Sequence, residues 1–203
     1  MKTKTCVAIL GCAVVAAAAI VLLSAKADGT YVPERVRAMQ EKARTGDAEA
    51  LLQLGNFHYN GDGVPRDVTE ALRWWRAAAE KGSVVAQLNL GTVLVQDASP
   101  ERVAEGVTWV TRAAEAGDEG AQRNLGLMYL QGRGVAKHLQ RAAIWLHRAA
   151  AKGDPASQYN LAVMFENGEG TARDLAESRR WYERAAQNGH PLARQWLERQ
   201  ERR

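Results

Sequence analysis

The chain has 203 residues and a formal net charge of +4, and three of the four surplus positive charges are Lys2, Lys4 and Lys26. The remainder is close to neutral, so its bulk charge gives no support to a nucleic-acid partner. Both cysteines, Cys6 and Cys12, also lie within residues 1–27. This excludes disulfide bonds and thiolate ligands from the rest of the chain.

Residues 1–27 are predicted to be a secretory signal peptide. A short basic start precedes an apolar run from Cys6 to Leu23, and small residues lead to a cleavage position between Ala27 and Asp28. The run is also near the lower limit for crossing a bilayer, so an uncleaved membrane anchor is the alternative. We expect export, with the bacterial periplasm as the main expectation and inner-membrane anchoring or secretion as alternatives.

Residues 28–45 are predicted to form an N-terminal capping helix, after which the chain repeats itself every 35 or 36 residues. Each repeat opens on a glycine, and Ala193 and Leu197 keep the same phase after the last one. Residues 190–203 are therefore expected to be a C-terminal capping helix. The predicted repeat domain, residues 46–189, consists of the segments 46–81, 82–116, 117–152 and 153–189.

Each repeat is predicted to contain two helices. In the first, helix A, small and apolar residues recur at spacings of four and three, which is one face of an α-helix. The second, helix B, carries a tryptophan followed one turn later by an alanine pair, a pattern typical of closely packed helices. We expect the recurring leucines and tryptophans to form the core: Leu54, Leu90, Leu125, Leu161, Trp74, Trp109, Trp145 and Trp181.

Two further tryptophans, Trp75 and Trp196, fall outside this phase. An exposed indole is a good anchor for a partner protein, whereas a buried one would fill a gap between repeats. Trp75 is kept as a candidate contact residue.

A glycine-rich loop joins helix A to helix B in three repeats, at Gly61-Asp62-Gly63, Gly132-Arg133-Gly134 and Gly168-Glu169-Gly170. A phosphate site would not place carboxylates at the middle position, because they repel the ligand. These loops are therefore predicted to be turns, with glycine permitting positive φ. The second repeat has Gln96 to Pro100 instead. This turn is expected to take a different path or to be more mobile, through either neutral drift or local recognition.

Amide side chains also recur in phase with the repeats. They lie seven and fourteen residues after each opening glycine, almost two helical turns apart, and so share one edge of helix A. Amides offer donors and acceptors together, which suits contact with an extended peptide; the alternative is that they brace loop carbonyls between repeats. The candidate contact residues of this amide ladder are Gln53, Asn60, Asn89, Gln96, Asn124, Gln131, Asn160 and Asn167.

No arrangement typical of catalysis is present in the sequence. His58, His138, His147 and His190 are spread over the first repeat, the third repeat and the C-terminal cap, and they lack the spacing of a metal motif. No G-x-S-x-G nucleophile motif occurs. We therefore expect no catalytic residue, no cofactor, no metal and no nucleic-acid partner.

The repeat resembles the Sel-1-like repeat, a relative of the tetratricopeptide repeat. One unit runs from Ala50 through Leu54-Gly55, Gly61-Asp62-Gly63-Val64, Ala71, Trp74 and Ala78-Ala79 to Gly82, and residues 117–153 repeat this motif. The resemblance implies an all-α fold, an α-solenoid superhelix of about four helix-turn-helix repeats with half-repeat caps. In related tetratricopeptide arrays helix A lines the binding groove.

The resemblance also implies a function. Members of the family act as protein-binding adaptors, so we expect a noncatalytic scaffold that binds a protein or extended peptide on the helix A face. The alternatives are a secreted adaptor in virulence or host contact, a membrane-tethered regulator of a membrane-associated partner, and a hydrolase of β-lactams or envelope glycans. Relatives linked to β-lactams depend on disulfide-linked units, which this chain lacks.

Overall fold

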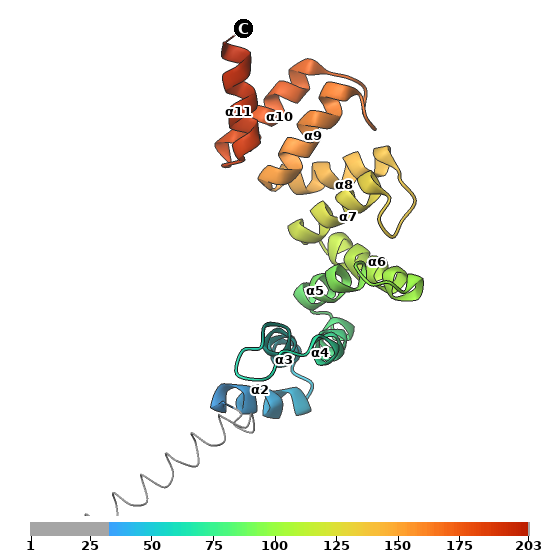
Figure 1. The fold of residues 1–203 in the computed structure, drawn as a ribbon, viewed down its shortest axis with the longest axis vertical. Helices are drawn as coiled ribbons and strands as arrows, with labels where there is room; N and C mark the ends of the chain where they lie inside the picture. The colour runs from blue at the N-terminus through green and yellow to red at the C-terminus, as the bar shows by residue number, and fades with distance from the viewer. Residues whose placement is uncertain (1–32, 203) are drawn as a thin grey trace, which may run out of the picture. The chain divides into compact units, whose positions relative to one another are not determined.

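A computed structural model describes residues 33–202, so the predicted signal peptide lies outside the described residues. Within this range every regular element is an α-helix (Figure 1). None of these helices is both long and apolar enough to cross a membrane. The helices are α2 (Glu34–Arg44), α3 (Ala48–Asn60), α4 (Val68–Glu80), α5 (Val84–Leu94), α6 (Pro100–Glu115), α7 (Glu119–Gln131), α8 (Leu139–Ala151), α9 (Pro155–Asn167), α10 (Leu175–Gln187) and α11 (Pro191–Glu201).

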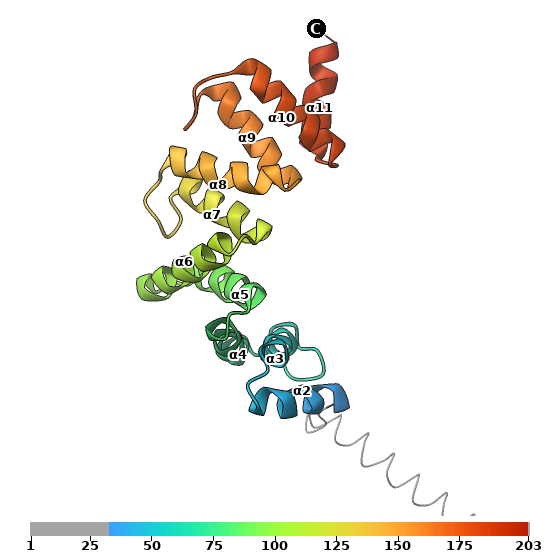
Figure 2. The same ribbon diagram turned by 180° about the vertical axis from the view of Figure 1, so that it is seen from behind.

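The chain divides between Trp74 and Trp75 into two compact units. In the first unit α2 packs on α3. In the second unit each helix from α5 to α11 packs on the next one along the chain, as both ribbon views show (Figures 1 and 2). Helices A are α3, α5, α7 and α9, and helices B are α4, α6, α8 and α10. This order of all-α helix pairs confirms the predicted fold class.

The opening glycine of each repeat separates a helix B from the next helix A. Gly117 and Gly153, for example, have φ angles of 93° and 108°, which glycine adopts without steric cost and which end the preceding helix. The following aspartate then caps the next helix: Asp118 accepts a hydrogen bond from the backbone N–H of Ala121. The pair of glycine and capping residue therefore stops one helix and starts another.

The glycine-rich loops are turns, as predicted. Gly132 ends α7 in the left-handed conformation, and its N–H donates to the Met128 carbonyl. The second glycine of each loop also has positive φ, and in addition it permits close packing. A Cβ atom on Gly134 would lie 2.9 Å from Val103 Cγ1, and one on Gly170 would overlap the Leu139 carbonyl of α8.

The second repeat takes the different path expected for it. Here α6 begins at Pro100, with Ser99 as its N-cap, and the short connection is held by an ion pair of 2.8 Å between Asp97 and Arg102. Glycine also replaces alanine ahead of the tryptophan, at Gly106. A Cβ atom there would lie 2.7 Å from the Val95 backbone nitrogen, so glycine permits the close approach of α5 and α6.

The recurring leucines lie in the core. Leu54, Leu90, Leu125 and Leu161 are at most 1% exposed, and small side chains on the facing helices are fully covered. Removing such leucine side chains from water is the main stabilising contribution available to residues 33–202, which contain no cysteine.

Two of the four recurring tryptophans occupy a shallower position than expected. Trp109 and Trp181 are buried, whereas Trp74 and Trp145 are only half-buried. An arginine three residues later covers the ring in three repeats, with its Cζ atom 4.7 Å from the Trp109 centroid and 4.4 Å from the Trp145 centroid. In these three repeats one face of the tryptophan ring is therefore covered by a guanidinium group.

The prediction that Trp75 is a partner contact is wrong, because its side chain is only 3% exposed. The residue after the recurring tryptophan points into the core in every repeat. Its counterparts Val110, Leu146 and Tyr182 are equally buried. Trp75 is therefore part of the packing of α4.

Candidate functional site

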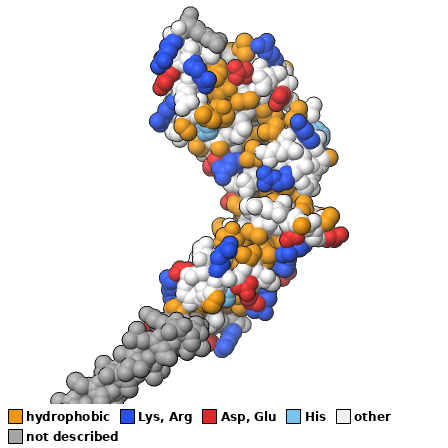
Figure 3. All heavy atoms as spheres, in the orientation of Figure 1, with side chains coloured by type: hydrophobic (Ala, Val, Ile, Leu, Met, Phe, Trp, Pro, Cys, Tyr) orange, Lys and Arg blue, Asp and Glu red, His pale blue; other side chains and the backbone are white. Residues whose placement is uncertain are grey.

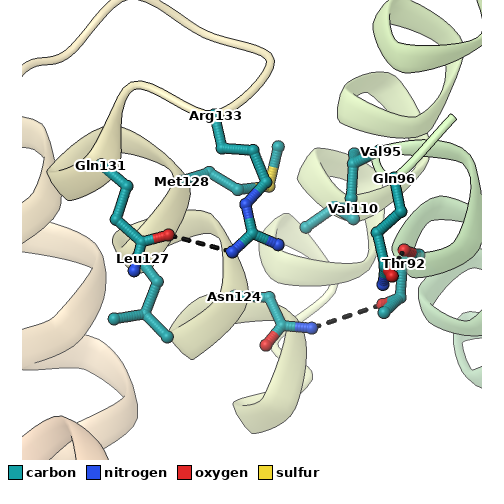
Figure 4. A pocket seen from close by; sticks show the side chains of 9 residues that line it. All are labelled: Thr92, Val95, Gln96, Val110, Asn124, Leu127, Met128, Gln131 and Arg133. Atoms are coloured by element: carbon teal, nitrogen blue, oxygen red, sulfur yellow. Dashed lines mark hydrogen bonds between the residues drawn. The ribbon is translucent and has the colours of Figure 1, made fainter. Parts of the chain in front are cut away.

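Three residues of the amide ladder meet in one hollow between α5 and α7. Gln96 lies in the turn that follows α5, and Asn124 and Gln131 come from α7. Figure 4 shows these side chains around a hollow of about 120 Å³, with the Arg133 guanidinium reaching toward its centre from the loop after α7. The apolar part of the lining consists of Val95, Val110, Leu127 and Met128.

The polar groups of this hollow form two hydrogen-bonded sets. Asn124 Nδ2 donates to Thr92 Oγ1 at 3.3 Å, which links α7 to α5. Gln96 Nε2 donates to the Thr92 carbonyl at 3.1 Å, and Arg133 Nη2 donates to Gln131 Oε1 at 3.0 Å. These bonds hold the side chains in place while leaving donors on Arg133 and Gln131 and an acceptor on Asn124. The hollow can therefore hydrogen-bond both the N–H and the C=O groups of a peptide.

The other ladder residues do not join this hollow. Gln53 donates to Glu49 and Asn160 donates to the Ala156 carbonyl, each within its own helix. Asn60 and Asn167 are exposed at the ends of α3 and α9, and Asn89 is half-buried in α5. Of the eight ladder residues, Gln96, Asn124 and Gln131 are thus the ones that line the hollow between α5 and α7.

A second set of amides, missed in the sequence, braces the repeats. Gln87, Gln122 and Gln158 donate to the carbonyls of Ala79, Ala114 and Ala150, at 3.3, 3.1 and 3.0 Å. Each bond ties the end of a helix B to the following helix A, which is the bracing role considered for the ladder. The signal was a glutamine five residues after the opening glycine, absent only from the first repeat, where Leu51 occurs.

His138, His190 and Trp196 serve packing and capping. His190 stacks on Tyr159 with ring centroids 4.4 Å apart, and Trp196 stacks on Tyr182 at 4.1 Å. His138 caps α8 through Nδ1. Within residues 33–202 no three potential ligand side chains are grouped so as to hold a metal ion.

The titratable groups with shifted pKa values also lie outside the hollow. The hydrogen bond from Arg76 lowers the pKa of Glu105, and this pair joins α4 to α6. Burial raises the pKa of the Tyr182 hydroxyl, helped by its hydrogen bond to Glu166. Both contacts connect one helix to another.

Comparison with known proteins identifies the repeat. The profile of the Sel1 repeat matches residues 48–83, 84–118, 120–154 and 155–190. A comparison with curated proteins gives no match.

Solved structures with a similar fold include two that are also similar in sequence. A protective antigen of uropathogenic Escherichia coli strains, with an SLR fold, is 33% identical with a TM-score of 0.74; a Sel1 repeat protein from Oxalobacter formigenes is 32% identical with a TM-score of 0.72. Both matches cover 78% of this chain, which spans 34% of the first protein and 65% of the second.

Cysteine rich protein B of Helicobacter pylori shares the fold alone. It is 22% identical with a TM-score of 0.50, and the match covers 63% of this chain and 92% of that protein. The four matched repeats and the two closer structural relatives agree with the helix pairs described above, and a repeat array of this kind is suited to protein–protein interaction. The chain therefore belongs to the Sel1 repeat family.

Proposed function

We propose that this protein is a noncatalytic scaffold that binds an extended segment of a partner protein in the groove between α5 and α7. The observation that carries this proposal is the convergence of Gln96, Asn124 and Gln131 in one hollow with Arg133. Amides fixed by their own hydrogen bonds lose little freedom when they bind a peptide backbone. The apolar lining beside them accepts a small apolar side chain of the same segment.

The place of action belongs to the same proposal. The basic start and apolar run of residues 1–27 support export, so the partner is expected in the bacterial periplasm or cell envelope. Action outside the cell on a host protein is the alternative, and one protein of similar sequence is a protective antigen of uropathogenic Escherichia coli strains. Cell fractionation with N-terminal sequencing of the mature protein separates the two locations and shows whether residues 1–27 are retained.

The binding proposal is tested by partner capture. The tagged full-length chain is cross-linked in intact cells and its partner is identified by mass spectrometry. The double variant Asn124→Ala, Gln131→Ala is expected to lose most of the captured partner. Asn160→Ala is the matched control, since Asn160 bonds only within its own helix. Equal capture by the double variant, at an unchanged melting temperature, would overturn the assignment of this groove.

A further inference from the structure

The third repeat differs from the other three in charge. Residues 117–152 contain six Lys or Arg and two Asp or Glu. The others have two more acidic than basic residues: four basic and six acidic in 46–81, two and four in 82–116, and four and six in 153–189. No acidic residue lies between Glu119 and Asp154, so positive charge gathers on α7, α8 and the loop between them.

Helix α8 presents this charge on one exposed side. The side chains that share it recur at helical spacing and form what we call the basic face: Gln140, Arg141, Ile144, His147 and Arg148. Ile144 lies at its centre and is 53% exposed. Figure 3 shows basic and hydrophobic side chains next to one another over the α7 and α8 region.

Comparison among the repeats shows that the basic face replaces a glutamate–arginine pair whose glutamate lies on helix B in each of the other repeats. Four residues before the recurring tryptophan, the other repeats have a glutamate that pairs with arginine: Glu70 with Arg73 at 3.1 Å, Glu105 with Arg76 at 2.9 Å, and Glu177 with Arg180 at 3.0 Å. The third repeat has Arg141 at this position, and Ile144 stands in the place of Arg73 and Arg180. An ion pair on the helix surface is thus exchanged for a cation beside an exposed apolar side chain.

The two arginines of the basic face are held in position by aromatic rings. Arg148 Cζ lies 4.4 Å from the Trp145 centroid, and Arg141 Cζ lies 5.6 Å from the Tyr129 centroid. Neither has a carboxylate of residues 33–202 within ion-pair distance, although Glu115 lines a hollow together with Arg141. A guanidinium that is already positioned loses less conformational freedom on meeting a carboxylate.

An apolar hollow adjoins Ile144. It is lined by Ala143 and His147 of α8 and by Leu161 and Phe165 of α9, and its volume of about 520 Å³ accommodates a large side chain. Arg148 lies on the border of the same hollow. Arg148 at the border of this hollow, and Arg141 on the other side of Ile144 along the basic face, complement an apolar side chain flanked by carboxylates.

We propose that the basic face of α8 is a second docking surface, and that its occupant is an acidic segment of a partner protein with a large apolar side chain at its centre. The apolar side chain enters the hollow beside Ile144, and the flanking carboxylates pair with Arg141 and Arg148. These residues are separate from Asn124 and Gln131, so this inference does not rest on the groove between α5 and α7.

The test uses a fluorescein-labelled peptide with a central Leu-Phe pair flanked by aspartates, and a matched peptide with lysines in their place. Binding to the purified full-length chain is measured by fluorescence anisotropy. The double variant Arg141→Glu, Ile144→Arg restores the glutamate–arginine pattern of the first and fourth repeats, and is therefore expected to fold. We expect the aspartate peptide to bind the wild-type chain, to weaken as salt is raised, and to bind the double variant at least about tenfold more weakly.

Several results would overturn the proposal. These are equal binding of the lysine peptide, equal binding by the folded double variant, or binding lost in Asn124→Ala, Gln131→Ala instead. Two further arms cover other occupants. Sedimentation of the chain with phosphatidylglycerol vesicles, or self-association that the double variant abolishes, without binding of the aspartate peptide, would assign this face to a lipid surface or to a second copy.

Discussion

Replacing Gly170 with alanine tests the structural role of the glycine-rich loops. Gly170 has a φ angle of 74°, and a Cβ atom there would overlap the Leu139 carbonyl. Gly153→Ala is the matched control, since Gly153 also has positive φ, at 108°, but nothing lies within 4 Å of an added Cβ atom.

The two substitutions share a conformational cost but differ in packing. A left-handed residue with a Cβ atom costs about 1–2 kcal/mol, which is the whole effect expected for Gly153→Ala. Gly170→Ala must also displace the loop from α8, and overpacking of this kind adds about 1–3 kcal/mol. We therefore expect a loss of unfolding free energy of about 2–5 kcal/mol for Gly170→Ala.

Urea denaturation of the purified chain followed by circular dichroism measures both free energies. The reasoning requires the larger loss at Gly170 with similar denaturant slopes in the two variants. Equal losses, or a larger loss at Gly153, would refute the view that the second glycine of the loop permits the loop to lie close to helix B of the preceding repeat, which for Gly170 is α8.

Three further predictions follow from the packing and the titratable contacts. Trp75→Ala should lower the unfolding free energy by about 3–5 kcal/mol, as for a buried aromatic residue. A loss below about 1 kcal/mol in a urea titration would contradict the burial of the Trp75 side chain. The pKa of Glu105 is lowered in the folded chain. Its contribution to the unfolding free energy is therefore fully present above the unfolded pKa of about 4.3, and it is lost as the pH falls below that value and through the lower pKa of the folded chain. Glu105→Gln should therefore reduce stability by only about 0.5 kcal/mol at pH 7, since the pair is partly solvated, and should reduce the difference between pH 7 and pH 3; an unchanged pH dependence would contradict this. The purified chain should hydrolyse neither a chromogenic cephalosporin nor peptidoglycan, and turnover that persists on repeated purification would revive the hydrolase alternative.

The helix pairs and the turns between them could be predicted from the recurring sequence. The opening glycines, the leucines of helix A and the glycine-rich loops depend on local conformation and on one helical face, and both repeat with the sequence. The different turn of the second repeat could also be predicted, because a chain that lacks both loop glycines cannot make the same turn.

Depth within the core was harder to predict from the sequence. The recurring tryptophan is buried in two repeats and only half-buried in the other two, while the residue after it is buried in all four but varies among Trp75, Val110, Leu146 and Tyr182. Because a different residue follows the tryptophan in each repeat, the sequence did not indicate that this position is always buried. Trp75 was misassigned for that reason. The meeting of Gln96 with Asn124 depends on the packing of α5 beside α7, which no spacing within one repeat reveals.

The most direct test of the central claim is site-specific photo-crosslinking in the cells that produce the protein. A photoreactive amino acid is placed at Gln131, on the edge of the hollow, and at Glu198, an exposed position on α11. The account predicts a discrete adduct with one partner from position 131, mapped by mass spectrometry to an extended segment of that partner, and none from position 198. The absence of an adduct at 131, or the same adducts from both positions, would contradict peptide binding in the groove between α5 and α7.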